Sequence, residues 1–148
     1  MRVNHIRSGR SKPGLRPQHL TGLCLVRDLC GGALDGAAVG ATVITLTPQR
    51  LVAAPRVADI GTAGSCTLLL QAALPCALFA AGGATELTLR GGTDAALAPP
   101  VGYLQQVLLP TLQRRLGLGV CSQLVRRGFF PQGGGELRIE VQEMRVRG

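Results

Sequence analysis

The feature that most constrains the fold of this chain is a pattern that occurs twice: a helix opened by proline and followed by two short strands. Pro17 opens a predicted helix of about fourteen residues, and Pro99–Pro100 precede a second helix at 101–116. Proline is accepted at the first helical position because the N–H group that it lacks would have no helical partner there. The strands that follow the two helices are expected at residues 33–35, 42–47, 121–126 and 136–143. This self-similarity predicts a repeated structural unit.

The second copy of the pattern is preceded by elements that the first copy lacks. They are typical of a strand, a small-residue turn, an apolar helix and another strand, at 56–60, 61–65, 66–81 and 85–89. Before its helix the first copy has only a short strand at 1–6. We therefore predict an α+β fold of β-α-β-α-β-β units. In it, 55–148 is a complete second repeat, and 1–54 is a partial first repeat whose opening strand and helix are missing, so that the chain is a fragment of one domain.

Two of the expected elements have clear periodicities. Leu137, Ile139 and Val141 alternate with charged or amide residues, which is typical of a strand that is buried on one face. In 101–116 the leucines and one valine fall on one helical face. Pro110 is expected to kink this helix, because its ring clashes with the preceding turn.

The chain is basic, and its cations are almost all arginines. The formal net charge is +8 at pH 7, and 15 of the 16 basic residues are arginine, clustered in Arg2–Arg16 and Arg114–Arg127. This balance favours a polyanionic partner, nucleic acid first, which would be held by its phosphates. The alternative is a set of arginines scattered over a solvated surface. Aromatic residues make up 3% of the chain and tryptophan is missing, so a platform for stacking bases is not expected.

The cysteines favour a reduced, intracellular protein. There are five, an odd number with no Cys-x-x-Cys pair, and most lie in apolar runs where a thiol behaves as a small hydrophobe. Zinc binding would require closer spacing or more histidine. No secretory signal is recognised, and the most apolar run, 66–81, is shorter than the roughly 20 residues of a membrane span. We expect no membrane contact.

A phosphate site is expected in the segment before and at the start of the first helix. Arg7, Arg10, Lys12 and Arg16 come within ten residues, followed by Gln18 and His19. A Lys-Pro-Gly turn fixes the backbone, so these side chains are held together. Arginine matches phosphate oxygens two at a time, and the first turn of a helix carries unpaired N–H groups that favour an anion.

Four segments together resemble the RNA 3′-terminal phosphate cyclase family, over essentially the whole chain. They are 7–20, 60–71, 90–100 with its Arg-Gly-Gly-Thr-Asp and Ala-Pro-Pro motifs, and 127–135. The resemblance implies repeats like the C-terminal domain of a bacterial translation initiation factor, related in fold to the enolpyruvyl transferases. It also implies that ATP and a divalent metal, Mg or Mn, serve to convert an RNA 3′-phosphate into a 2′,3′-cyclic phosphodiester, through an adenylylated histidine.

The resemblance also implies roles for particular residues. Arg7 and Arg10 match arginines near the RNA end and the nucleotide phosphates, and Gln18 and His19 match polar residues of the same RNA- and phosphate-binding site. Gln71 matches a nucleotide-contacting glutamine, and Pro99 would lie near the adenine ring.

Several residues of these motifs could instead have a purely structural role. Gln71 could bond a neighbouring backbone group, and His19 could cap the helix or lie in the core. Asp94 could belong to an ordinary turn. For the triple glycine 133–135, a tight hairpin connection is favoured over a phosphate loop.

Two residues of the family's site are not matched in this sequence: an acidic residue near the start of the first repeat, and the adenylylated histidine of a later repeat. His19 belongs to a different motif. We therefore expect no catalytic residue in this chain, binding at best, and no covalent nucleotidyl intermediate. The expected partners are RNA 3′ ends and ATP, not DNA, and the family resemblance implies a nuclear location. The alternatives are a non-catalytic scaffold of the same family in ribosome biogenesis, and a basic RNA-binding module without preference for a 3′-phosphate.

Overall fold

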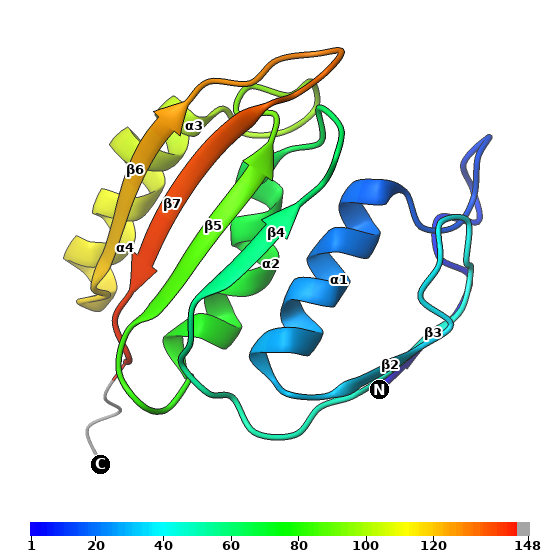
Figure 1. Cartoon of the computed structure of the whole chain (residues 1–148), viewed down its shortest axis with the longest axis horizontal. Coiled ribbons are helices and arrows are strands. Elements are labelled where there is room, and N and C mark those ends of the chain that lie inside the picture. The colour runs from blue at the N-terminus through cyan, green and yellow to red at the C-terminus, as the bar shows by residue number, and fades with distance from the viewer. Residues whose placement is uncertain (145–148) are drawn as a thin grey trace.

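The structure is a computed structural model that describes residues 1–144, and it holds two β-sheets with helices between and beside them (Figure 1). The larger sheet has four strands in the order β4-β5-β7-β6, and the smaller has three in the order β1-β3-β2. Helices and strands both contribute substantially, so the α+β prediction is confirmed.

The four-stranded sheet is formed by the second part of the chain. Its strands are β4 (Arg56–Asp59), β5 (Thr85–Gly91), β6 (Val120–Arg126) and β7 (Gly135–Val141). β4 pairs with β5 in parallel, whereas β7 lies antiparallel to both β5 and β6. One face carries the apolar side chains of β5 and β7, which alternate with exposed residues as the sequence pattern predicts.

Helices cover that face, as Figure 1 shows. α2 (Cys66–Leu78) begins at Ser65, whose hydroxyl accepts the Leu68 N–H. The helix predicted at 101–116 is continuous but has three parts, α3 (Val101–Tyr103), a π-helical turn η1 (Leu104–Leu108) and α4 (Leu109–Leu116). The structure thus has a π turn just before Pro110, where a kink was expected. Widening the turn by one residue accommodates a proline that cannot donate to the preceding turn.

The three-stranded sheet is smaller and belongs to the first part of the chain. It consists of β1 (Arg2–Val3), β3 (Ile44–Thr47) and β2 (Ala33–Asp35), all antiparallel neighbours. α1 (Pro17–Leu29) lies beside it. The strand expected at 1–6 is shorter, since His5 and Arg7 have positive φ angles that are incompatible with an extended strand.

The two sheets share a strand order. In each, a strand is followed by a helix and then by two strands, the last of which lies in the middle: β1-β3-β2 corresponds to β5-β7-β6. In the four-stranded sheet β4 pairs with the outer edge of β5, whereas β1 has no such neighbour within residues 1–144.

The main hydrophobic core lies between the four-stranded sheet and its helices and includes Leu25 and Leu29 of α1. Among the cysteines, all free, Cys30 and Cys66 are buried as predicted, but Cys121 is exposed because it lies on the uncovered face of β6. Burial raises the pKa of the Cys66 thiol to about 11. No helix within residues 1–144 is long and apolar enough to cross a membrane.

Candidate phosphate-binding site

The basic loop before α1 is held in one shape by its own contacts. Arg7 donates from Nη1 to the carbonyl oxygens of Lys12 and Gly14, at 2.9 Å each. Gly14 has φ +78°, and a Cβ there would collide with the backbone of Gly40. The sequence-predicted turn is therefore rigid, and part of the Arg7 guanidinium is used to make it so.

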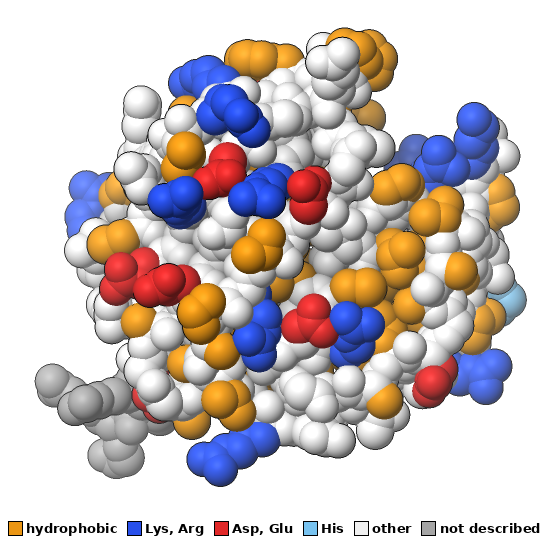
Figure 2. All heavy atoms as spheres, in the orientation of Figure 1, with side chains coloured by type: hydrophobic (Ala, Val, Ile, Leu, Met, Phe, Trp, Pro, Cys, Tyr) orange, Lys and Arg blue, Asp and Glu red, His pale blue; other side chains and the backbone are white. Residues whose placement is uncertain are grey.

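Three further cations stand out from this loop. Arg10, Lys12 and Arg16 are all exposed. Figure 2 shows Lys and Arg side chains gathered at the end of the molecule where Figure 1 draws this loop. Exposed cations at one rigid loop create a local positive potential that would attract a phosphate.

His19 caps the start of α1 with one ring nitrogen and leaves the other free to act. The Arg16 N–H donates to His19 Nδ1 at 3.1 Å. Partial burial, Arg7 and Arg16 each lower the pKa of His19 below its usual value, which favours the neutral ring at pH 7. A neutral imidazole that accepts at Nδ1 carries its proton on Nε2. The capping alternative is thus observed, and it orients an N–H donor outward.

Gln18 joins the start of α1 to the start of α2. Its Oε1 accepts the backbone N–H of Ser65 at 2.6 Å, across 47 residues of sequence. A Cβ on Gly64 would lie 3.1 Å from the Cβ of Gln18 and 2.9 Å from Cγ2 of Ile60, so a larger residue would require these side chains to move. The two helix starts are consequently held next to each other. At α2 the N–H groups of Ser65, Cys66 and Leu68 already have acceptors in Gln18, the Gly92 carbonyl and the Ser65 hydroxyl.

Pro99 and Gln71 lie on or against α2. Thr67 donates from Oγ1 to the carbonyl oxygen of Pro99 at 2.7 Å, and Thr67 in turn lies 2.7 Å from the Ser65 hydroxyl oxygen. Gln71 is exposed, one helical turn beyond Thr67, and none of the hydrogen bonds found within residues 1–144 involves its side chain. Sequence reasoning missed the buried pair Ser65 and Thr67, although a serine directly before an apolar run is a recognisable N-cap signal.

A groove of about 500 Å³ opens beside these residues. Arg7, Gln18 and His19 line its polar end, so the structure brings these three predicted residues together. The remaining lining is apolar and comes from β1, α1, β3 and α2, including Leu23, Val26, Ile44, Leu68 and Ala72. Arg10, Gln71 and Pro99 are outside this lining. The groove offers apolar surface next to three hydrogen-bonding groups, which suits a ligand with a flat apolar part and a phosphate.

Two further structural alternatives are observed, besides the cap formed by His19. Asp94 accepts hydrogen bonds from its neighbour Thr93 and from Arg127, at 2.7 and 2.9 Å, and so closes a turn. Gly133 and Gly134 have positive φ angles and form the tight hairpin between β6 and β7, with Phe129 and Gly133 exchanging backbone hydrogen bonds.

A divalent metal does not fit the described residues as a protein-held ion. Within residues 1–144, no group of three or more histidine, cysteine or acidic side chains could hold one. The donors described above do fit an anionic nucleotide, since cations, amides and helix N-termini all favour phosphate.

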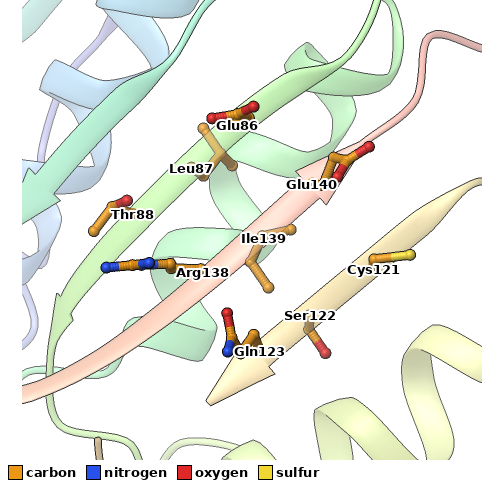
Figure 3. Close-up of a pocket in the computed structure, with 9 residues that line it drawn as sticks. All are labelled: Glu86, Leu87, Thr88, Cys121, Ser122, Gln123, Arg138, Ile139 and Glu140. Atoms are coloured by element: carbon orange, nitrogen blue, oxygen red, sulfur yellow. The ribbon is translucent and has the colours of Figure 1, made fainter. Parts of the chain in front are cut away.

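A second hollow, on the uncovered face of the four-stranded sheet, is unrelated to this site. Figure 3 shows its side chains rising from β5, β7 and β6, and its volume is about 280 Å³. Glu86 and Glu140 lie directly opposite each other there, and Arg138, the cation of this lining, is already paired with Glu136, so the hollow does not favour a phosphate.

Comparison with known proteins agrees with the resemblance seen in the motifs. Residues 1–147 match the model of the family described as RNA 3′-terminal phosphate cyclase. The chain is 46% identical over 142 residues to the protein of that name from Pseudomonas fluorescens. The aligned region covers 96% of the chain and 41% of the relative. The chain is 42% identical over 147 residues to the protein of that name from Pyrococcus abyssi, covering 99% of the chain and 42% of the relative. The chain thus spans about two-fifths of the length of these relatives. It belongs to the RNA 3′-terminal phosphate cyclase family.

Proposed function

We propose that this chain binds the 3′-phosphate end of RNA and a nucleotide, as the phosphate-recognising part of a cyclase-type site. The observation that carries the proposal is the meeting of Arg7, Gln18 and His19 at the adjoining starts of α1 and α2. The reaction of the family, conversion of an RNA 3′-phosphate to a 2′,3′-cyclic phosphodiester, is proposed here as the context of that binding.

The roles of the residues follow from their geometry. The Nε2–H of neutral His19 would donate to a phosphate oxygen, and the Gln18 amide nitrogen would add a second donor. Arg10, Lys12 and Arg16 would balance the charge of the RNA end. Gln71 and Pro99 would lie along the nucleotide. ATP, when bound, would supply the phosphoanhydride whose cleavage drives cyclisation, and no step is assigned to a metal.

We do not propose His19 or His5 as the nucleotidyl acceptor. His19 Nδ1 is occupied by the Arg16 N–H, and its Nε2 carries the proton. Incubation with ATP labelled in the α-phosphate is expected to give no stable protein–AMP adduct. A labelled adduct that is lost in His19→Gln would contradict this assignment.

The binding proposal is tested by competition. A fluorescent RNA oligonucleotide with a 3′-phosphate should be displaced more readily by unlabelled 3′-phosphate than by 3′-hydroxyl competitor. Arg10→Gln should weaken binding of the phosphorylated RNA roughly 10- to 100-fold, the usual contribution of a charge-assisted contact. Arg50→Gln, which removes an exposed charge far from the loop in sequence, is the control. Equal affinity for the two competitors would reject the proposal.

Two further predictions accompany this proposal. The shared strand order supports residues 1–54 as a partial repeat of the unit formed by 55–148, with its uncovered face at the groove. Nuclear location rests on the family resemblance only, and the bacterial and archaeal origin of the relatives compared above gives it no support.

A further inference from the structure

The tip of the β6–β7 hairpin exposes more apolar surface than a solvated loop needs. Phe129 is 54% exposed and Phe130 is 87% exposed. These are two of the three phenylalanines in the whole sequence. Leu97 is fully exposed in the 92–100 loop, which the Arg127–Asp94 ion pair ties to the hairpin. Although the chain has few aromatic residues, two exposed aromatic rings are therefore adjacent at this hairpin tip.

A polar hollow of about 220 Å³ lies beneath the same hairpin. Arg90, Arg126 and Gln132 contribute donors to it, and Asp59 is its acidic member. The rest of the lining is Thr62 and glycines at 61, 91, 134 and 135. Without side chains at these glycines, a ligand can approach the backbone. The Asp59 carboxylate accepts the Gly61 N–H at 2.8 Å, and Arg90 is paired with Glu136 at 3.1 Å. Within residues 1–144, Arg126 is therefore the cation of this lining that has no acidic partner.

The hairpin is continuous with the phosphate-binding site through the loop between β4 and α2. A Cβ on Gly133 would lie 2.5 Å from the carbonyl oxygen of Thr62, so the hairpin and this loop are in close contact. Gly64, two residues farther and at most roughly 8 Å away, contacts Gln18. Figure 1 shows the hairpin tip, this loop and the start of α1 at the same end of the molecule. A few nucleotides of single-stranded RNA would reach from the start of α1 to the hairpin tip.

The geometry points to a second binding position on this hairpin, for the single-stranded RNA that precedes the 3′ end. The Phe130 ring would stack against a base, and Arg126 with Gln132 would hold a backbone phosphate over the polar hollow. This inference rests on the proposed function for the position of the 3′ end. Rings beside arginines fit single-stranded nucleic acid, because stacking and phosphate pairing are the two contacts that such a strand offers.

The test compares a short and a long ligand. The probes are fluorescent 3′-phosphorylated uridine oligonucleotides, one a dinucleotide and one an octanucleotide, titrated by anisotropy. Phe130→Ala should weaken octanucleotide binding roughly 5- to 10-fold, as expected for one stacked base, and leave dinucleotide binding unchanged. Phe79→Ala is the matched control, since Phe79 is 51% exposed at the other end of α2.

Salt dependence tests the phosphate contact separately. For the octanucleotide, Arg126→Gln should reduce the slope of log affinity against log salt by about 0.7, the value for one contact to a single strand. Arg115→Gln, on the exposed side of α4, should leave this slope closer to that of the wild type. A slope and an affinity that change equally in the two arginine variants would overturn the inference.

The outcomes separate this inference from the proposed function. If dinucleotides with 3′-phosphate and 3′-hydroxyl bind equally while Phe130→Ala still weakens the octanucleotide, the hairpin position stands and the 3′-phosphate site fails. If 3′-phosphate is preferred but Phe130→Ala behaves like Phe79→Ala, the 3′-phosphate site stands and the hairpin inference is wrong.

Discussion

The two sheets of this molecule share a strand order but differ in how they are covered. In the four-stranded sheet, β5 and β7 alternate fully buried and exposed residues beneath α2 and α4. In the three-stranded sheet, Ile44 and Leu46 are buried but stand outside the main core, while Val3 is 38% exposed beside the groove. The helix α1 joins the two, since its Leu25 and Leu29 belong to the core of the larger sheet. The part of the molecule that contains the three-stranded sheet and the basic loop is therefore attached, through α1, to the main core of the four-stranded sheet.

This comparison predicts unequal costs for the same substitution. Leu89→Ala, at a position with 0% exposure in the middle of the main core, should lower the free energy of unfolding by about 3–5 kcal/mol. Leu46→Ala, in the three-stranded sheet, should cost about 2 kcal/mol, the lower end of the usual range, because Leu46 lies outside the main core. Urea unfolding measures both. Equal losses would mean that the two sheets share one core.

The close contact between the hairpin and the β4–α2 loop gives the next largest effect. Gly133→Ala should cost at least about 2 kcal/mol, because it adds a clash with the Thr62 carbonyl oxygen to the strain of a positive φ. Gly134 has a similar φ with open space around it, so Gly134→Ala should cost only about 1 kcal/mol. Thermal unfolding of the pair measures the contact itself, and identical melting temperatures would show that the loop and hairpin move independently.

Removing the hydrogen bond that links the starts of α1 and α2 is expected to have a smaller effect on stability. Gln18→Ala removes the acceptor for the Ser65 N–H and should lower stability by about 1–2 kcal/mol. Gln71→Ala, on the exposed side of α2, should change it by less than about 0.5 kcal/mol. Urea unfolding of both glutamine variants provides the measurement. If Gln18→Ala leaves the free energy of unfolding unchanged, the two units are not coupled at this point.

The smallest effect concerns pH and belongs to the four-stranded sheet alone. Hydrogen bonds from Arg90 and Arg138 hold the pKa of Glu136 below its usual value of 4.5. A carboxylate whose pKa is lower in the folded state contributes stability above its unfolded pKa, and this stability is lost as the pH falls through the folded value. Glu136→Gln should therefore flatten the decline of melting temperature below about pH 4.5. Glu140→Gln, on the same strand, is the control, and parallel declines in both variants would contradict the role of Glu136.

The sequence carried much of this architecture because local signals agreed with the fold. Pro17 with an expected length of about fourteen residues, and the alternation at 137–141, predicted α1 and β7 closely. The π turn before Pro110 was not predictable, since a proline in a helix can be accommodated by a kink or by a wider turn. The early end of β1 depends on positive φ angles at His5 and Arg7, which ordinary residues seldom adopt.

The site was predictable in its residue types but not in its contacts. The motif indicated Arg7, Gln18 and His19, but it did not show that each side chain also makes a hydrogen bond within the fold. Arg7 donates to its own loop, Gln18 accepts from the start of α2, and His19 accepts at the cap of α1. The partners of these bonds lie up to 47 residues away, so spacing alone could not reveal them. The exposed rings at 129–130 were missed because composition averages over the whole chain.

The central claim is that the starts of α1 and α2 form a 3′-phosphate site in this chain as it stands. The most direct measurement is thermal unfolding of the wild-type chain with ATP and either a 3′-phosphorylated or a 3′-hydroxyl RNA oligonucleotide. Ligand that binds only the folded state raises the melting temperature. We expect a larger rise with the 3′-phosphorylated RNA than with the 3′-hydroxyl RNA. Equal shifts with both RNAs, or no shift with either, would contradict the account.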